Sequence, residues 1–253
     1  MPAMLDPWSR FRNATRARIG LGRSGDALPT HALLDFQLAH ARARDAVHGA
    51  VDFDALAAEL APLPCLQVAS RATDRSVYLR RPDLGRRLAL DSTLPHGDWD
   101  VVFVIADGLS AAAVRDQAAA TLRACLDRLA GWTIAPIVLA SQARVALGDD
   151  VGQQMGAKLC VMLIGERPGL SVANSLGVYL TWEPRPGRRD SERNCISNVH
   201  SDGLSHDGAA EKLVWLMTEA MRRRLTGVDL KEDAGAVLPA EKTGNAVAIQ
   251  FRE

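Results

Sequence analysis

Glu166 stands in the most sharply defined chemical setting of this sequence. It follows an apolar run that ends at Ile164, and Gly165 and Pro168 flank it, so we expect its backbone to be held rigidly. An ionised carboxylate is a hydrogen-bond acceptor, and in this position it can bind amide or hydroxyl groups of a ligand. The competing interpretation is a salt bridge between Glu166 and Arg167 or another of the many arginines.

Cys195 offers a second candidate chemistry, because His200 lies close to it in the segment RNCISNVH. A thiol nucleophile needs a neighbouring base, but no catalytic-cysteine signature accompanies this pair. A lone cysteine is most commonly a small buried hydrophobic residue. A zinc site would need two further ligands, and the other cysteines fall on predicted helices, on a strand or in a distant proline-flanked loop. We therefore expect no metal site. Around Cys195 we expect a loop or a short edge strand.

Ser110 in DGLSA lies at a strand-to-helix turn, where some hydrolases place a nucleophilic serine, but the pattern GxSxG is absent. A role as helix N-cap fits Ser110 better. The sequence also lacks GxGxxG after a strand and GxxxxGK[ST], so neither a dinucleotide nor a P-loop nucleotide is supported.

Strands and helices alternate from Trp99 onward. An alanine-rich helix ending at Gly131, a short helix from Val151 to Met155 and a terminal helix that begins at His206 separate or follow apolar, strand-like runs. This alternation predicts an α/β fold with a Rossmann-like, mostly parallel, doubly wound sheet. The four predicted strands lie in DVVFVIA, TIAPIVLA, KLCVMLIG and SLGVYLTWEP.

Three polar loops should meet at the carboxyl edge of this sheet, where open parallel sheets bind their ligands. They are ADGLS, SQARVALGDD, which contains Val145, and GERPG, which contains Glu166. Each loop alone can be an ordinary turn. Three of them on one edge favour a ligand site.

The first part of the chain has a different pattern. An arginine-bearing arm precedes a helix from Thr30, the expected N-cap, to Gly49, and a shorter helix follows Asp52. We therefore divide the chain into an N-terminal arm and α-helical domain, residues 1–95, and a ligand-contacting domain, residues 96–253. Beyond Gly227 the sequence is polar and aperiodic, which predicts a loose tail.

Composition excludes several classes of protein. Hydrophobic residues make up 47% and charged residues 24%, which is typical of a folded domain and not of a disordered chain. The formal net charge is +0, so the chain lacks the basic excess that general nucleic-acid binding requires. Its apolar runs are too short to span a bilayer, and we expect no secretion signal. Four cysteines without a CxxC suit reduced thiols in the cytoplasm.

Several long segments, taken together, resemble one known family, the small (light) subunit of ethanolamine ammonia-lyase. The resemblance extends from about Ile19 to about Gly227, and the tail departs from the family pattern. The segments that carry it are ALPTHALLDFQLAHARARDAVH, DVVFVIADGLSA, IGERPGLS, NSLGVYLTWEPRPGR, DSERNCISNVH and GLSHDGAAEKLVWL.

The resemblance implies an adenosylcobalamin-dependent carbon–nitrogen lyase that converts ethanolamine to acetaldehyde and ammonia by radical chemistry. A large (heavy) subunit would hold the substrate, and this chain would enclose the cobalamin and be active only in a heteromeric assembly of paired large and small subunits. Three cobalamin contacts of the family map onto Val145, Glu166 and Cys195. No catalytic residue is then expected in this chain, and its location would be the cytoplasm, with packaging into a bacterial microcompartment as a further property of the family.

Two alternatives remain open at this point. A stand-alone Rossmann-like hydrolase would use Ser110 or Cys195 and would be active without a partner. A noncatalytic scaffold would bind the large partner but leave the affinity for cobalamin unchanged.

Overall fold

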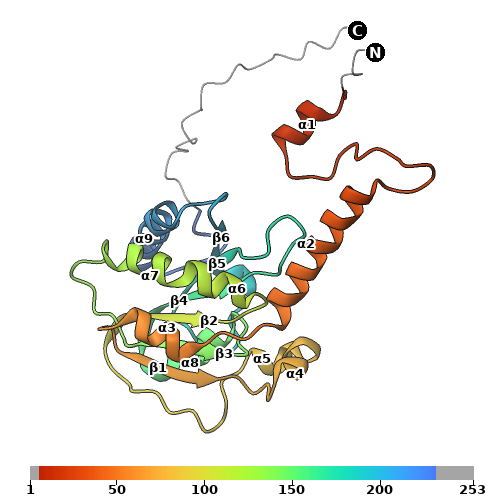
Figure 1. Ribbon diagram of the computed structural model, residues 1–253. Helices are drawn as coiled ribbons and strands as arrows, with labels where there is room; N and C mark the ends of the chain where they lie inside the picture. The colour runs from red at the N-terminus through yellow and green to blue at the C-terminus, as the bar shows by residue number, and fades with distance from the viewer. Residues whose placement is uncertain (1–5, 232–253) are drawn as a thin grey trace.

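The computed structural model describes residues 6–231, whose core is one six-stranded sheet with helices on both faces (Figure 1). The strand order across the sheet is β1-β3-β2-β4-β5-β6. The predicted α/β class is confirmed. The strands are β1 Cys65–Ala69, β2 Trp99–Ala106, β3 Ile137–Ser141, β4 Ala157–Gly165, β5 Leu176–Trp182 and β6 Arg193–Val199.

The sheet is mixed but mostly parallel, as predicted. Strands β1, β3, β2 and β4 pair in parallel, whereas β5 and β6 are antiparallel to their neighbours. A parallel return needs a crossover of a dozen or more residues, usually a helix. The loop of residues 166–175 between β4 and β5 is shorter than that, so β5 runs back along β4. The Rossmann-like, doubly wound winding itself stays a prediction.

The helices bury the two faces of the sheet. One apolar cluster joins β2, β4 and β5 to α3, α7 and α9, and a second cluster joins the opposite faces of β2 and β4 to α8. The continuous apolar runs of the central strands therefore arise because both of their faces are covered. The helices are α1 Ser9–Ala14, α2 Thr30–His48, α3 Phe53–Leu60, α4 Arg75–Arg80, α5 Pro82–Gly85, α6 Ala111–Ala113, the π-helix η1 Val114–Ala118, α7 Ala119–Leu126, α8 Leu147–Met155, the 3-10 helix η2 Asp190–Glu192 and α9 His206–Arg223.

Some predicted boundaries were wrong. The alanine-rich helix is continuous through α6, η1 and α7 but ends at Leu126, before Gly131. Helix α8 begins at Leu147, earlier than Val151, and so takes up the last four residues of the predicted loop SQARVALGDD. Strand β1 was missed: Cys65 was placed in a proline-flanked loop, but it begins an edge strand that pairs with β3.

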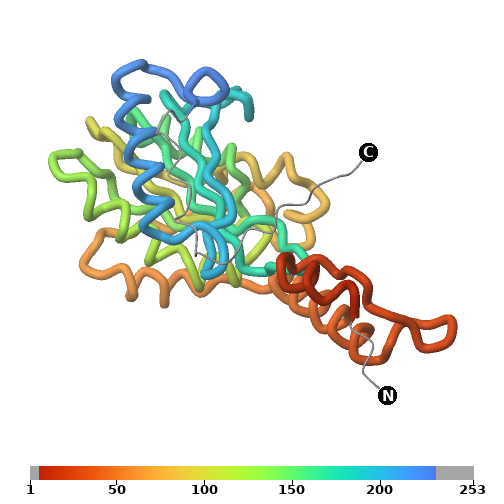
Figure 2. Tube along the Cα trace, turned by 90° about the horizontal axis from the view of Figure 1, so that it is seen from above, coloured from red at the N-terminus to blue at the C-terminus, as the bar shows by residue number. Residues whose placement is uncertain are grey.

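Helix α2 forms as predicted, but its apolar side is not part of the core. Its N-cap is Pro29, without a side-chain capping bond, so the capping role predicted for Thr30 was wrong. Leu33, Leu34 and Leu38 are 41%, 57% and 50% exposed. The helix projects from the body of the molecule, with the arm around α1 near its far end (Figures 1 and 2). Helical spacing of apolar residues predicts a helix but not what covers it.

The start of the C-terminal tail is packed against the sheet. Leu230 is 1% exposed, and the Asn194 side-chain amide donates to the Leu230 carbonyl at 2.7 Å. The predicted loose segment is therefore held as far as Leu230, and residues 232–253 lie outside the described part of the chain.

A buried ion pair joins α8 to β6. The two terminal nitrogens of Arg193 each donate to one oxygen of Asp149 at 2.7 Å, and the two side chains are 2% and 3% exposed. Burial alone would lower the pKa of Arg193, but the hydrogen bonds and charge of Asp149 raise it above its ordinary value, so the guanidinium stays charged. This bidentate pair fixes the helix that follows the Val145 loop relative to the strand that carries Cys195.

We expect Asp149→Ala to lower the free energy of unfolding by about 3–5 kcal/mol, because it leaves Arg193 charged and buried without its partner. Urea denaturation followed by circular dichroism measures this. The matched control is Asp83→Ala, which breaks the exposed pair with Arg81 and should leave the unfolding midpoint unchanged. Equal, small effects of both variants would contradict a structural role for the buried pair.

Candidate functional site

A cavity of about 340 Å³ opens at the carboxyl ends of β2 and β4. Val145, from the loop between β3 and α8, and Glu166, from the loop after β4, both line it. Its other polar lining residues are Tyr78, Arg144, Arg167 and Tyr179. Two of the three loops predicted to carry a ligand therefore contribute a predicted site residue to the same cavity.

Glu166 is fixed by its neighbours but keeps one oxygen available. Its Oε2 accepts a hydrogen bond from the Ser175 hydroxyl at 2.5 Å and from the backbone amide of Asn198 at 3.4 Å. Across residues 6–231, no hydrogen bond reaches Oε1, and no ion pair forms with Arg167, so the salt-bridge interpretation is wrong for this part of the chain. A ligand amide or hydroxyl can donate to Oε1.

Gly177 allows Glu166 to lie this close to β5. A Cβ at this position would be 3.1 Å from Glu166 Oε1 and 3.2 Å from the Tyr179 ring. Both distances are tighter than ordinary van der Waals contact, so a side chain there would crowd both groups. The glycine of NSLGVYL thus accommodates a close approach.

Cys195 lies beside this cavity on the edge strand β6. It is exposed, so the common expectation of a buried cysteine was wrong, and it faces Tyr179 across the β5–β6 pairing. Loss of hydration around the sulfur raises the pKa of Cys195, the hydrogen bond with Tyr179 lowers it, and the charge of Glu166 raises it again, leaving it above the ordinary value. Val145 and Glu166 therefore line one cavity, and Tyr179, which also lines it, is paired with Cys195 on the neighbouring strand.

The residues considered as nucleophiles are engaged elsewhere. Ser110 is 0% exposed, donates to the Ala173 carbonyl at 2.7 Å and caps α6 by accepting from the Ala113 amide, so its predicted N-cap role is confirmed. His200 is buried and accepts a hydrogen bond from the Asp202 amide at 3.3 Å. Since a thiol with a raised pKa is a weak nucleophile, neither hydrolase arrangement is supported.

Asp107, at the end of β2, was treated in the sequence only as part of a turn. Its buried carboxylate accepts from the amides of Gln142 and Ala143 at 2.9 and 3.0 Å and forms an ion pair with Arg75 at 3.4 Å. Gln142 has a φ of 53°, a strained value for a residue other than glycine. Asp107 therefore holds the sharp turn after which Arg144 and Val145 come. The only feature of the sequence that pointed to this role was the position of Asp107 directly after a buried strand.

Tyr78 is a further residue that the sequence did not reveal. It is 0% exposed, and its hydroxyl donates to the Ala143 carbonyl at 3.1 Å. The guanidinium groups of Arg75 and Arg144 both lie over its ring, at 4.7 and 4.2 Å from the ring centroid. The short helix α4, which carries Tyr78, has no strong periodicity from which it could have been predicted.

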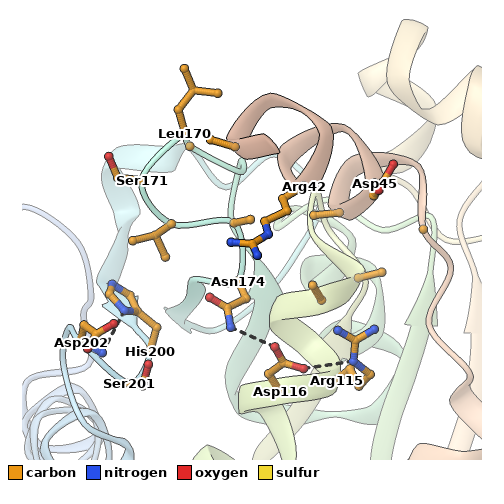
Figure 3. Close-up of a pocket in the computed structure, with 18 of the residues that line it drawn as sticks. Arg42, Asp45, Arg115, Asp116, Leu170, Ser171, Asn174, His200, Ser201 and Asp202 are labelled. Atoms are coloured by element: carbon orange, nitrogen blue, oxygen red, sulfur yellow. Dashed lines mark hydrogen bonds and ion pairs between the residues drawn. The ribbon is translucent and has the colours of Figure 1, made fainter. Parts of the chain in front are cut away.

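A larger cavity, of about 580 Å³, lies beyond the loop of residues 166–175 (Figure 3). Its walls come from the second half of α2, the start of α6, this loop and residues 200–202. Four of its charged groups pair with one another, Arg115 with Asp116 and Arg16 with Asp202, and Asp116 also accepts from the Asn174 side chain. Val145, Glu166 and Cys195 do not line it, and we assign the candidate site to the smaller cavity.

Residues 6–231 contain no group of three or more histidine, cysteine or acidic side chains placed to hold a metal ion.

Comparison with known proteins gives a consistent result over nearly the whole length of the chain. The sequence model of the ethanolamine ammonia-lyase light chain (EutC) family matches residues 5–231. The ethanolamine ammonia-lyase small subunit of Pseudomonas putida strain W619 is 50% identical over 258 aligned positions, which cover 97% of this chain and 95% of the relative. The small subunits from Azotobacter vinelandii and Rhodopseudomonas palustris strain BisA53 are 51% and 53% identical, over 92% and 88% of this chain and 91% and 89% of their own lengths.

The raised pKa of Cys195 predicts slow alkylation near neutral pH. In the isolated chain we expect the iodoacetamide rate at Cys195 to climb about tenfold per pH unit to beyond the ordinary thiol pKa of 9.0, because only the thiolate reacts. Peptide mapping by mass spectrometry gives the rate. Tyr179→Phe, which removes a hydrogen bond that stabilises the thiolate, should move the rise to still higher pH. A plateau below about pH 8 would contradict this and restore the nucleophile interpretation.

Proposed function

This chain belongs to the ethanolamine ammonia-lyase light-chain family, and on that basis we propose that it is the small subunit of an adenosylcobalamin-dependent ethanolamine ammonia-lyase. In this proposal it encloses the cobalamin against the large subunit, which catalyses the conversion of ethanolamine to acetaldehyde and ammonia. The observation that carries the cofactor role is that Val145 and Glu166 line one cavity, with Cys195 beside it.

The cavity residues suit a cobalamin. Its corrin ring is fringed with amide arms and linked to a nucleotide tail, so a binding site needs acceptors for amide hydrogens and apolar surface for the ring edge. Oε1 of Glu166 is such an acceptor, and Val145 offers apolar contact. Cys195 and Tyr179 extend the contact surface along β5 and β6.

This chain's share of the activity is to bind and orient the cofactor and to exclude water from it. When bound, adenosylcobalamin supplies the radical chemistry of the reaction. Ser110 and His200 are held by the fold, and Cys195 is poorly ionised, so we propose no catalytic acid, base or nucleophile in this chain.

The arm and α2 are the proposed contacts with the large subunit. Leu33, Leu34 and Leu38 expose apolar surface on one projecting helix, and Trp8 and Phe11 on the arm are 48% and 47% exposed. Clustered exposed apolar side chains of this kind mark interaction surfaces. The proposal therefore includes paired large and small subunits in one heteromeric assembly.

The proposed location is the cytoplasm, either free or within a bacterial microcompartment. In the described part of the chain, no helix combines the length and apolar character that crossing a membrane requires.

Glu166→Ala tests the cofactor role in the assembled complex. We expect the dissociation constant for cobalamin to rise about tenfold, because the lost acceptor removes a hydrogen bond to a charged group. Equilibrium dialysis with cyanocobalamin measures the change, and Glu211→Ala on the exposed side of α9 is the control. Undiminished cobalamin affinity together with an unchanged reaction rate would remove Glu166 from the site.

Deletion of residues 1–18 tests the role of the arm. If the arm wraps the large subunit, the purified truncated chain should fail to form the complex with that subunit in size-exclusion chromatography. Normal assembly in purified protein, with encapsulation lost in cells, would instead identify the arm as a microcompartment address.

A further inference from the structure

Arg144 is an arginine on the candidate cavity that the fold leaves without an anionic partner. It precedes Val145 in the loop held by Asp107, and its guanidinium lies 4.2 Å from the centroid of the Tyr78 ring. Its Nη2 donates to the Tyr78 carbonyl at 3.3 Å, whereas its buried Nε makes no hydrogen bond. Among residues 6–231, Arg144 forms no ion pair with a carboxylate.

Two neighbouring arginines are paired with carboxylates, whereas Arg167, which also lines the cavity, forms no ion pair among residues 6–231 and lacks the stacking that holds Arg144. Arg75 binds Asp107 and Arg87 binds Asp150. A partly buried charge without a counterion is costly, so proteins rarely keep one unless something else satisfies it. The stacking on Tyr78 holds the guanidinium plane in place, which prepares it to bind an anion without further ordering.

The charged side chains that line the cavity are Arg144, Arg167 and Glu166. The cavity can therefore receive a ligand that carries both an anionic group and hydrogen-bond donors. Cobalamin has this combination: its nucleotide loop contains a phosphodiester, while its side arms are neutral amides. Glu166 would repel the phosphodiester and accept hydrogen bonds from amide N–H groups, whereas Arg144 would attract the phosphodiester.

We propose that Arg144 binds the phosphodiester of the cobalamin nucleotide loop, an inference that rests on the function proposed above. A guanidinium matches phosphate oxygens with two parallel hydrogen bonds, which gives direction as well as charge. This assignment turns the nucleotide end of the cofactor toward the loop between β3 and α8. Glu166 then binds an amide arm on the corrin.

The test compares ligands with and without the phosphodiester in the assembled complex with the large subunit. Cyanocobalamin contains the whole nucleotide loop, dicyanocobinamide lacks it, and cobinamide phosphate has a phosphate without the nucleoside. For Arg144→Gln we expect the dissociation constants of cyanocobalamin and cobinamide phosphate to rise about 10- to 100-fold and that of cobinamide to stay unchanged. Equilibrium dialysis read by corrin absorbance gives all three constants.

Two further variants sharpen the comparison. Arg144→Lys keeps the charge but loses the planar fork and the stacking on Tyr78, so it should weaken cyanocobalamin binding less than Arg144→Gln. Arg222→Gln removes an exposed arginine on α9, paired only within its own helix, and should change none of the constants.

Three outcomes would overturn the inference, and they are distinguishable. An equal loss for all three ligands with a lower unfolding midpoint would make Arg144 a support of its loop. Weaker association of the two subunits, with unchanged ligand constants in the complex that remains, would show that Arg144 pairs with a carboxylate of the large subunit. If the wild-type complex failed to bind cobalamin, the proposed function would fall as well, whereas the first two outcomes leave it standing.

Discussion

The turn from β3 into α8 depends on one buried carboxylate. Gln142 and Ala143 present amides that would otherwise be unpaired inside the protein, and Asp107 accepts both of them from the end of the neighbouring strand. Arg75 balances the charge, while Tyr78 holds the Ala143 carbonyl. The strained backbone at Gln142 persists because these contacts over-determine it. The turn therefore sets the position of Arg144 and Val145, which follow it and line the cavity.

The opposite wall of the cavity is held by a separate set of contacts. The Ser175 hydroxyl and the Asn198 backbone amide donate to Glu166, and Tyr179, which lines the same cavity, is hydrogen-bonded to Cys195. The ion pair between Asp149 and Arg193 links α8, which follows the Val145 loop, to β6, which pairs with the strand that carries Tyr179. The cavity is therefore organised before any ligand arrives, which reduces the entropy lost on binding.

The sequence predicted those parts of the structure that local pattern determines. The buried strands are apolar and β-branched, and Glu166 could be singled out because glycine and proline flank it. Strand β1 was missed because an edge strand of five residues after Pro64 has little pattern of its own. The roles of Asp107 and Tyr78 arise from contacts across 35 and 65 positions of the chain, which no spacing rule detects. Helical periodicity likewise predicted α2 but not the exposure of its leucines.

Arg75, which forms the ion pair with Asp107, also holds the base of the projecting helix α2. Arg75 Nε donates to the Val47 carbonyl in the last turn of α2 at 2.6 Å, and its Nη1 donates to the Gly108 carbonyl at 2.8 Å. The base of the apolar helix and the turn that positions Val145 thus share one guanidinium. A partner that docks on α2 meets a helix whose base is already fixed relative to the cavity. Because the connection consists of short, partly buried hydrogen bonds, it sets the geometry between the two surfaces without requiring either to move.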